Sequence, residues 1–245
     1  MTKNALLHSV TLPTLLASAW FALPCNAAEP VILGNPNPSV EELMRARPGS
    51  AGVFVPQPDE TIRHVQSGFV CPDRLPNVNF WSLLITPSPL GPGNDVGCDY
   101  GRMKDGKTAN GAETKFSIVI AKAQPGTTLD DAFKRYQADM HRAFPNWKLK
   151  GPVIGPDSIR VRRSDGTPVA LPEFQSEADD VMVDNRPFIS ELVVGVFGGW
   201  IVQLRTSYPQ LTGDDRANGV DRPASTYVWA TSVREFAEMI QGATR

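Results

Sequence analysis

The chain contains little cysteine, little histidine and no run of basic residues, and each shortage excludes a class of function. It has three cysteines and three histidines in 245 residues, and 24 basic side chains against 26 acidic ones. The spacing of the cysteines and histidines matches no zinc site, and the cysteines form no C-x-x-C redox pair. Without a basic face, neither a nucleic acid nor an anionic membrane surface is an expected partner. We expect no cofactor.

Familiar catalytic signatures are also missing. The sequence has no G-x-S-x-G, no H-E-x-x-H, no P-loop and no G-x-G-x-x-G that opens a helix. A Ser-His-Asp site would have to use His64 or His141. His64 falls in a predicted strand, where an ordinary sheet residue is the favoured interpretation. His141 lies beside Arg142, opposite the apolar side of a predicted helix, so we expect it to be solvated.

Residues 1–27 have the pattern of a secretory signal. Lys3 provides the positive start, Leu6–Leu23 the apolar stretch, and a cut after Ala27 places Cys25 at position −3. The stretch is too interrupted by polar residues and Pro13 to span a membrane, which takes about 20 clean apolar residues. A lipoprotein signal that uses Cys25 fits less well, because proline precedes the cysteine. We therefore expect export to the bacterial periplasm or outside the cell.

After the signal, two further regions can be distinguished. Residues 28–60 read as an extended N-terminal arm with one short helix, which begins at the capping-box pattern of Ser39 and Glu42. Residues 61–245 read as a single α+β globular domain. Its two cysteines, Cys71 and Cys98, are expected to form a disulfide, because isolated pairs in exported proteins are usually bridged.

Most of the globular region is expected to be strand. Glu191–Tyr208 is an apolar hairpin with Gly198 and Gly199 at its turn, and we place it at the centre of the sheet. Alternating or β-branched segments predict four earlier strands, at 62–70, 77–86, 95–103 and 113–121. Shorter strands are expected at 147–149, 158–163 and 181–183, whereas 171–180 reads as a mobile acidic loop.

Two helices are expected to cover the sheet. Thr128 can cap a helix that extends to residue 144, with Leu129, Phe133, Tyr136 and Met140 on its apolar side. A last helix is expected at 221–242. The predicted fold class is therefore α+β: a twisted antiparallel β-sheet with flanking helices and one disulfide.

Several polar groups are candidate ligand sites. Asp179, Asp180 and Asp184 could hold a cation such as Ca²⁺, but they lack the glycine and the closing glutamate of an EF-hand, so a solvated loop is favoured. The same holds for Asn94, Asp95 and Asp99.

Two further sets of side chains have a functional and a structural interpretation. Arg160 and Arg162 could bind an anion, although an edge strand protected by charge is preferred. Four tryptophans could be exposed binding residues, but each lies in an apolar run, so we expect them to pack in the core; they are Trp81, Trp147, Trp200 and Trp229.

The order of elements resembles the PsbP-like and DcrB-like α/β group. The resemblance rests on Ser67-Gly68-Phe69, on the helix at 128–144, on Gly199 to Leu204 leading into Tyr208-Pro209, and on Phe236 to Ile240. It implies a twisted antiparallel sheet flanked by helices over 61–243. It also implies a non-enzymatic accessory role.

Two functions of different classes remain open. The first is a non-catalytic periplasmic or secreted accessory or binding protein, with an unknown protein or small ligand as its partner. The alternative is a cell-envelope hydrolase that uses an acidic pair such as Glu173 with Glu177 or Asp179. Converging carboxylates with raised pKa would favour the hydrolase.

Overall fold

The computed structural model describes residues 38–72, 74–75, 78–102, 114–153, 161–162, 168–169 and 173–210. The signal segment and the helix expected at 221–242 lie outside this part of the chain. So do Arg160 and Trp229.

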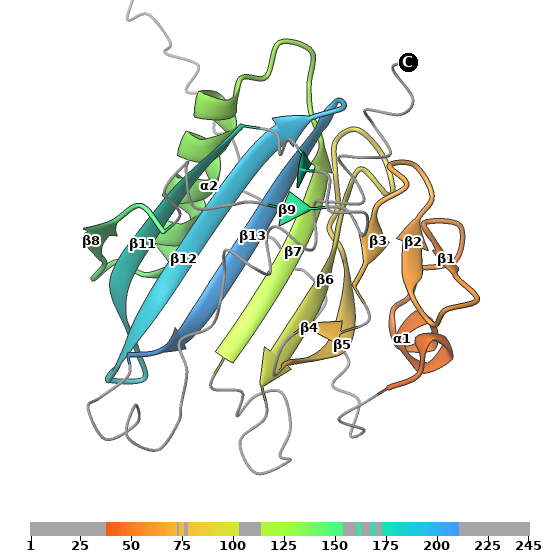
Figure 1. The fold of residues 1–245 in the computed structure, drawn as a ribbon, viewed down its shortest axis with the longest axis horizontal. Coiled ribbons are helices and arrows are strands. Elements are labelled where there is room, and N and C mark those ends of the chain that lie inside the picture. Colours follow the sequence, from red (N-terminus) through yellow and green to blue (C-terminus); the bar gives the residue numbers. More distant parts are fainter. Residues whose placement is uncertain are drawn as a thin grey trace, which may run out of the picture.

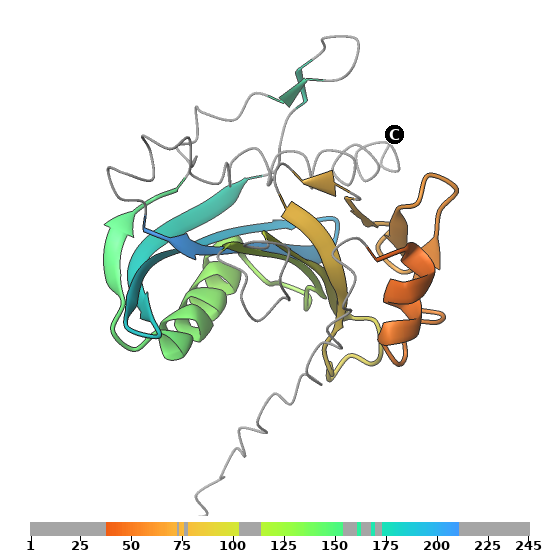
Figure 2. The same ribbon diagram turned by 90° about the horizontal axis from the view of Figure 1, so that it is seen from below.

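The described residues are organised around an eight-stranded antiparallel sheet in the order β4-β5-β6-β7-β13-β12-β11-β8 (Figure 1). Its strands are β4 (Arg74–Leu75), β5 (Val78–Ile85), β6 (Asp95–Arg102), β7 (Thr114–Lys122), β8 (Lys148–Gly151), β11 (Phe174–Val183), β12 (Arg186–Phe197) and β13 (Trp200–Pro209). The sheet is strongly curved, and helix α2 lies against its concave side (Figure 2).

The central hairpin is confirmed. β12 and β13 pair along their length, beginning with Phe197 opposite Trp200 next to the turn. β7 pairs with the other edge of β13, and β11 pairs with the other edge of β12. Gly198 and Gly199 form the turn with φ of 59° and 74°, a conformation that suits glycine because it lacks a Cβ. Val193 and Val194 point to opposite faces and both are fully buried, so the hairpin is covered on both sides.

Helix α2 (Leu129–Ala143) also follows its sequence signals. The Thr128 side chain accepts a hydrogen bond from the Asp131 backbone N–H, which caps the helix. Ala132, Tyr136 and Met140 are buried, and the helix contacts β12 and β11. Phe133 is only partly buried at the border of this contact.

The acidic segment near residue 175 is the main correction to the predicted fold. It belongs to strand β11, which pairs with β12 along ten residues, and is not a mobile loop. Glu177 and Asp179 alternate with Ala178, which is what a strand with two different faces requires. Asp184 and Asn185, with φ of 48° and 61°, form the two-residue turn into β12.

The expected strand at 62–70 is instead two short strands with a turn between them. β2 (Ile62–His64) and β3 (Val70–Cys71) form a three-stranded sheet with β1 (Phe54–Pro56). Gly68, with φ of 75°, allows the turn. The short helix α1 (Val40–Ala46) contacts β5 and β1, and β9 (Val161–Arg162) pairs with β10 (Pro168–Val169).

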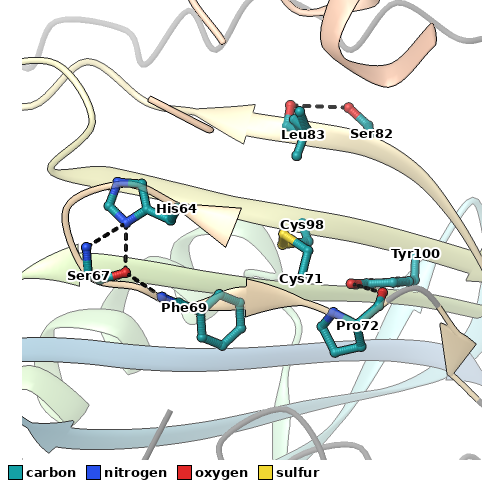
Figure 3. The surroundings of a disulfide bond; sticks show 9 residues. All are labelled: His64, Ser67, Phe69, Cys71, Pro72, Ser82, Leu83, Cys98 and Tyr100. Atoms are coloured by element: carbon teal, nitrogen blue, oxygen red, sulfur yellow. Dashed lines mark hydrogen bonds between the residues drawn. A yellow bond between two sulfur atoms is a disulfide. The ribbon is translucent and has the colours of Figure 1, made fainter. Parts of the chain in front are cut away.

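The expected disulfide is present between Cys71 and Cys98, with a Cα–Cα distance of 6.0 Å (Figure 3). It joins the small sheet, through β3, to β6 of the large sheet. The fold is α+β in the broad sense, with only α1 and α2 as α-helices in the described part. Neither is long and apolar enough to cross a membrane.

Candidate functional site

Three titratable side chains meet where α2 lies against β11, the strand next to the edge strand β8. His141 Nε2 lies 2.7 Å from Glu177 Oε1 and 2.9 Å from Asp179 Oδ2. The Asp179 side chain is fully buried, whereas Glu177 and His141 are 9% and 18% exposed. Protein therefore encloses the cluster at Asp179, whereas solvent can reach it at the His141 imidazole.

The regular geometry of a strand and a helix brings these groups together. Glu177 and Asp179 are two residues apart on β11, so both side chains point to the face that α2 covers. Gln137 and His141 are four residues apart on α2, so they lie on the same side of the helix. A β-bulge in the pairing of β11 with β8 falls between Ala178 and Asp179, a feature common beside functional sites.

Neighbouring side chains fix two of the three groups. The Gln137 amide donates a hydrogen bond to Glu177 Oε2. The Trp147 ring stacks on the His141 imidazole with ring centroids 3.5 Å apart and planes 4° from parallel. Trp147 is 38% exposed, so the expectation that it packs in the core is wrong. It instead covers the outer face of the imidazole.

The cluster has too few protons for its acceptors. Nε2 of a histidine carries at most one proton, so it cannot donate to both carboxylates with full strength. Burial and the neighbouring Glu177 charge raise the pKa of Asp179, with His141 opposing. Asp179 Oδ1 is buried and has no hydrogen-bond partner among the described residues. Two carboxylates and one imidazole nitrogen therefore converge with an unmet need for positive charge.

A divalent cation would meet that need. The three ligand atoms lie within 4.8 Å of one another, which is close enough for one ion to contact all of them. One nitrogen and two carboxylate oxygens suit Zn²⁺ and neighbouring first-row ions such as Mn²⁺ and Co²⁺. Three protein ligands leave at least one coordination position for water or a ligand.

The structure does not assemble the aspartates in the combination considered from the sequence. Asp180 lies on the opposite face of β11 and pairs with Lys150 at 3.1 Å, and Asp184 lies in the turn after the strand. Asp179 alone joins the cluster. Of the proposed acidic pairs, Glu177 with Asp179 is adjacent on one face, whereas Glu173 is exposed just before the strand begins.

The carboxylates near Cys98 form no cluster among the described residues. Asp99 accepts a hydrogen bond from the Ser117 hydroxyl at 2.6 Å, and burial raises its pKa to about 6. Burial also raises the pKa of Asp95 to about 6. Asn94 donates to the Leu90 carbonyl within its own loop. The side chains of Arg162 and Trp81 are outside the described part, and Trp200 is buried as expected.

His141 differs from its expected surroundings, whereas His64 lies in a strand as expected. His141 is not a solvated helix residue, because its ring is held between Trp147 and two carboxylates. His64 is a strand residue as expected, but it is fully buried. The alternation of Glu177 and Asp179 is the sequence signal for one polar strand face, and it becomes visible once the segment is recognised as a strand.

No protein-family model matches the chain, and no curated protein matches it. Solved structures with a partly similar path include a mutant of protein Mog1, at 9% identity and a TM-score of 0.32, covering 65% of this chain and 87% of that chain. Another is the extracellular domain of PknH from Mycobacterium tuberculosis, at 12% identity and a TM-score of 0.27, covering 56% of this chain and 63% of that chain. Neither score carries an argument about function.

Proposed function

We propose that this protein is an exported, non-catalytic binding protein whose ligand includes a divalent transition-metal ion. The convergence of His141 Nε2, Glu177 Oε1 and Asp179 Oδ2 carries the proposal. The ion would replace the shared proton of the imidazole and balance the charge of the two carboxylates. The open coordination position would admit an external donor, such as a small ligand or a side chain of a partner.

Two further observations support this class of function. The resemblance to PsbP-like and DcrB-like proteins implies a non-enzymatic accessory role. The Cys71–Cys98 disulfide is compatible with an oxidising compartment, as is the signal pattern of residues 1–27. Amino-terminal sequencing of the protein recovered from its producing cells tests export, and we expect the mature chain to begin at Ala28.

The metal is tested on purified mature protein after dialysis against a chelator. We expect one Zn²⁺, Mn²⁺ or Co²⁺ per chain in equilibrium dialysis. The melting temperature should rise with metal concentration, because an ion that binds only the folded state stabilises it. Asp179→Asn and His141→Gln should each weaken binding at least tenfold, since even the loss of a side chain that only supports a ligand costs roughly 10- to 100-fold.

Asp180→Asn is the matched control. Asp180 is the next residue on the same strand, but it lies on the other face and pairs with Lys150. Its variant should bind the metal like the wild type. Equal loss in both aspartate variants, or no saturable binding of any of the three ions at about 0.1 mM, would overturn the proposal.

A hydrolase is the second candidate, favoured by the adjacent carboxylates and the raised pKa of Asp179. Two carboxylates in different environments can divide the roles of acid and base. Metal-free turnover of chromogenic esters or glycosides that disappears in Glu177→Gln would support this candidate. A metal-binding protein without such turnover supports the first.

A further inference from the structure

Trp147 is the side chain at the cluster to which the proposed function gives no role. Its indole ring lies face to face with the His141 imidazole, with ring centroids 3.5 Å apart and planes 4° from parallel. Trp147 is 38% exposed, so packing in the core does not explain why a tryptophan stands here. A large aromatic side chain that covers a candidate metal ligand calls for a role at that ligand.

The backbone on both sides of Trp147 is tied to the two elements that carry the cluster. Before it lies the turn that follows α2, in which the Trp147 backbone N–H donates to the Phe144 carbonyl at 3.0 Å. After it, β8 pairs with β11, and Leu149 lies opposite Asp179. The segment that joins the helix to the sheet therefore also places the indole over His141.

The stack supplies an orientation that hydrogen bonds leave open. A histidine that binds a metal usually donates its second ring N–H to a carboxylate or carbonyl, and this bond fixes the ring. His141 faces both carboxylates with Nε2, and within the described part of the chain no acceptor holds Nδ1. Glu177, by contrast, is held by a hydrogen bond from Gln137. Contact with the Trp147 ring therefore takes over the task of fixing the imidazole plane.

The geometry of the stack also favours a positively charged imidazole. Because carbon atoms in contact lie about 3.5 to 4.0 Å apart, a centroid distance of 3.5 Å leaves little sideways offset between the rings. Neutral aromatic rings prefer an offset or edge-to-face arrangement, whereas a cation is attracted to the face of an indole. An ion bound at Nε2 draws electrons from the imidazole and makes it more positive. The stack therefore suits a metal-bound His141 better than a neutral one.

We propose that Trp147 is a positioning residue that makes the cluster select an ion that prefers a nitrogen ligand, such as Zn²⁺, over one that prefers oxygen, such as Mn²⁺. The proposal rests on the metal binding proposed above and narrows it. Imidazole suits Zn²⁺, whereas carboxylates and water suit Mn²⁺. An ion that depends on His141 Nε2 gains from a fixed ring, and an ion held chiefly by Glu177 and Asp179 gains little. The indole offers no ligand atom of its own, so Trp147 acts through His141.

The test compares the Zn²⁺ and Mn²⁺ affinities of the mature protein and three variants, measured by calorimetry after a chelator has removed bound metal. Trp147→Leu removes the ring; it should weaken Zn²⁺ binding at least about tenfold, as the loss of a ligand's support does, and Mn²⁺ binding less than about threefold. Trp147→Phe keeps an aromatic face and should restore most of the Zn²⁺ affinity. Leu149→Ala is the control, because Leu149 is 62% exposed on the same segment and does not stack on His141. Both of its affinities should equal those of the wild type.

The contrary outcomes can be told apart. Equal weakening of both ions in Trp147→Leu would mean that the ring only holds the cluster together, and an unchanged Zn²⁺ affinity would mean that it has no role; either result overturns the inference. A wild-type protein that binds neither ion would overturn the metal site itself, and this inference with it. The NMR signals of the His141 ring protons in the metal-free wild type test the stack directly, because a ring above an indole face gives signals shifted upfield. Signals at the positions of an unstacked histidine would overturn the inference even if a variant failed to fold.

Discussion

His64 offers a sharp test of how burial controls stability in this fold. Its ring is fully buried against Trp200 and Phe54, with ring centroids 5.5 Å and 5.7 Å away. Nδ1 lies 2.7 Å from the Ser67 hydroxyl and accepts the Ser67 backbone N–H, which satisfies that nitrogen of the neutral ring (Figure 3), whereas Nε2 is buried without a hydrogen-bond partner among the described residues. Burial lowers the pKa of His64 to about 4 from 6.5.

The sign of the pH effect follows from this lowered pKa. Above pH 6.5 the ring is neutral in both states, so its contribution to stability is fully present. As the pH falls from 6.5 toward 4, the His64 imidazole becomes protonated in the unfolded state but stays neutral in the folded state, so the folded protein loses stability. Between about pH 7.5 and 4.5 this loss amounts to about 2.5 kcal/mol, because each pKa unit corresponds to about 1.4 kcal/mol.

Comparison with a variant isolates this contribution from opposing groups. The raised pKa values of Asp95 and Asp99 act with the opposite sign, since their protonation stabilises the folded state as the pH falls. His64→Asn keeps an acceptor near the Nδ1 position but cannot titrate. We expect the variant to be less stable than wild type at about pH 7.5, because the ring contacts are lost.

Urea unfolding at a series of pH values gives the measurement. The stability difference between wild type and His64→Asn should shrink by about 2 to 3 kcal/mol between about pH 7.5 and 4.5, or reverse. A difference that stays constant over this range would show that His64 is not held neutral by its surroundings.

Three more predictions concern the framework. Replacing both Cys71 and Cys98 by alanine should lower the free energy of unfolding by about 3.5 kcal/mol, measured by urea unfolding, because the bridge closes a loop between residues 27 apart; an unchanged value would contradict the pairing. Met140→Ala should cost about 2 to 5 kcal/mol and Phe133→Ala clearly less, because Met140 is fully buried and Phe133 only partly; the reverse order in thermal unfolding would refute this packing. Val194→Asp should abolish the soluble protein recovered on expression, since an unpaired buried charge costs several kcal/mol; normal yield would contradict a central hairpin.

The parts of the fold that follow from local rules could be predicted from the sequence. The Gly198-Gly199 turn, the Thr128 cap and the apolar side of α2 each have a short-range physical cause, and each is found as expected. Most of strand β11 could not be predicted, because its charges suggest solvent exposure. In the structure the two faces of this strand differ, and burial of Glu177 and Asp179 depends on α2, which is distant in sequence.

The candidate sites were harder to predict than the framework for the same reason. His141 and Asp179 are 38 residues apart, and their contact exists only because α2 crosses the sheet at β11. Periodicity shows which face a side chain occupies, but the partner on the facing element depends on the packing.

The same polar groups make a last prediction, which separates function from stability. Asp179 is fully buried, has one oxygen without a partner among the described residues and lies beside the like charge of Glu177. Such a group lowers stability, so its removal need not harm the fold. With a chelator present, at about pH 7.5, Asp179→Asn should unfold at the same temperature as wild type or higher, because asparagine keeps an acceptor for His141 and removes the charge. With saturating Zn²⁺ the order should reverse, because only the wild type gains the binding free energy of the ion. A large loss of stability in the chelator-treated variant would mean that the cluster serves to hold α2 on the sheet, and its acids would then have a structural role in place of a binding one.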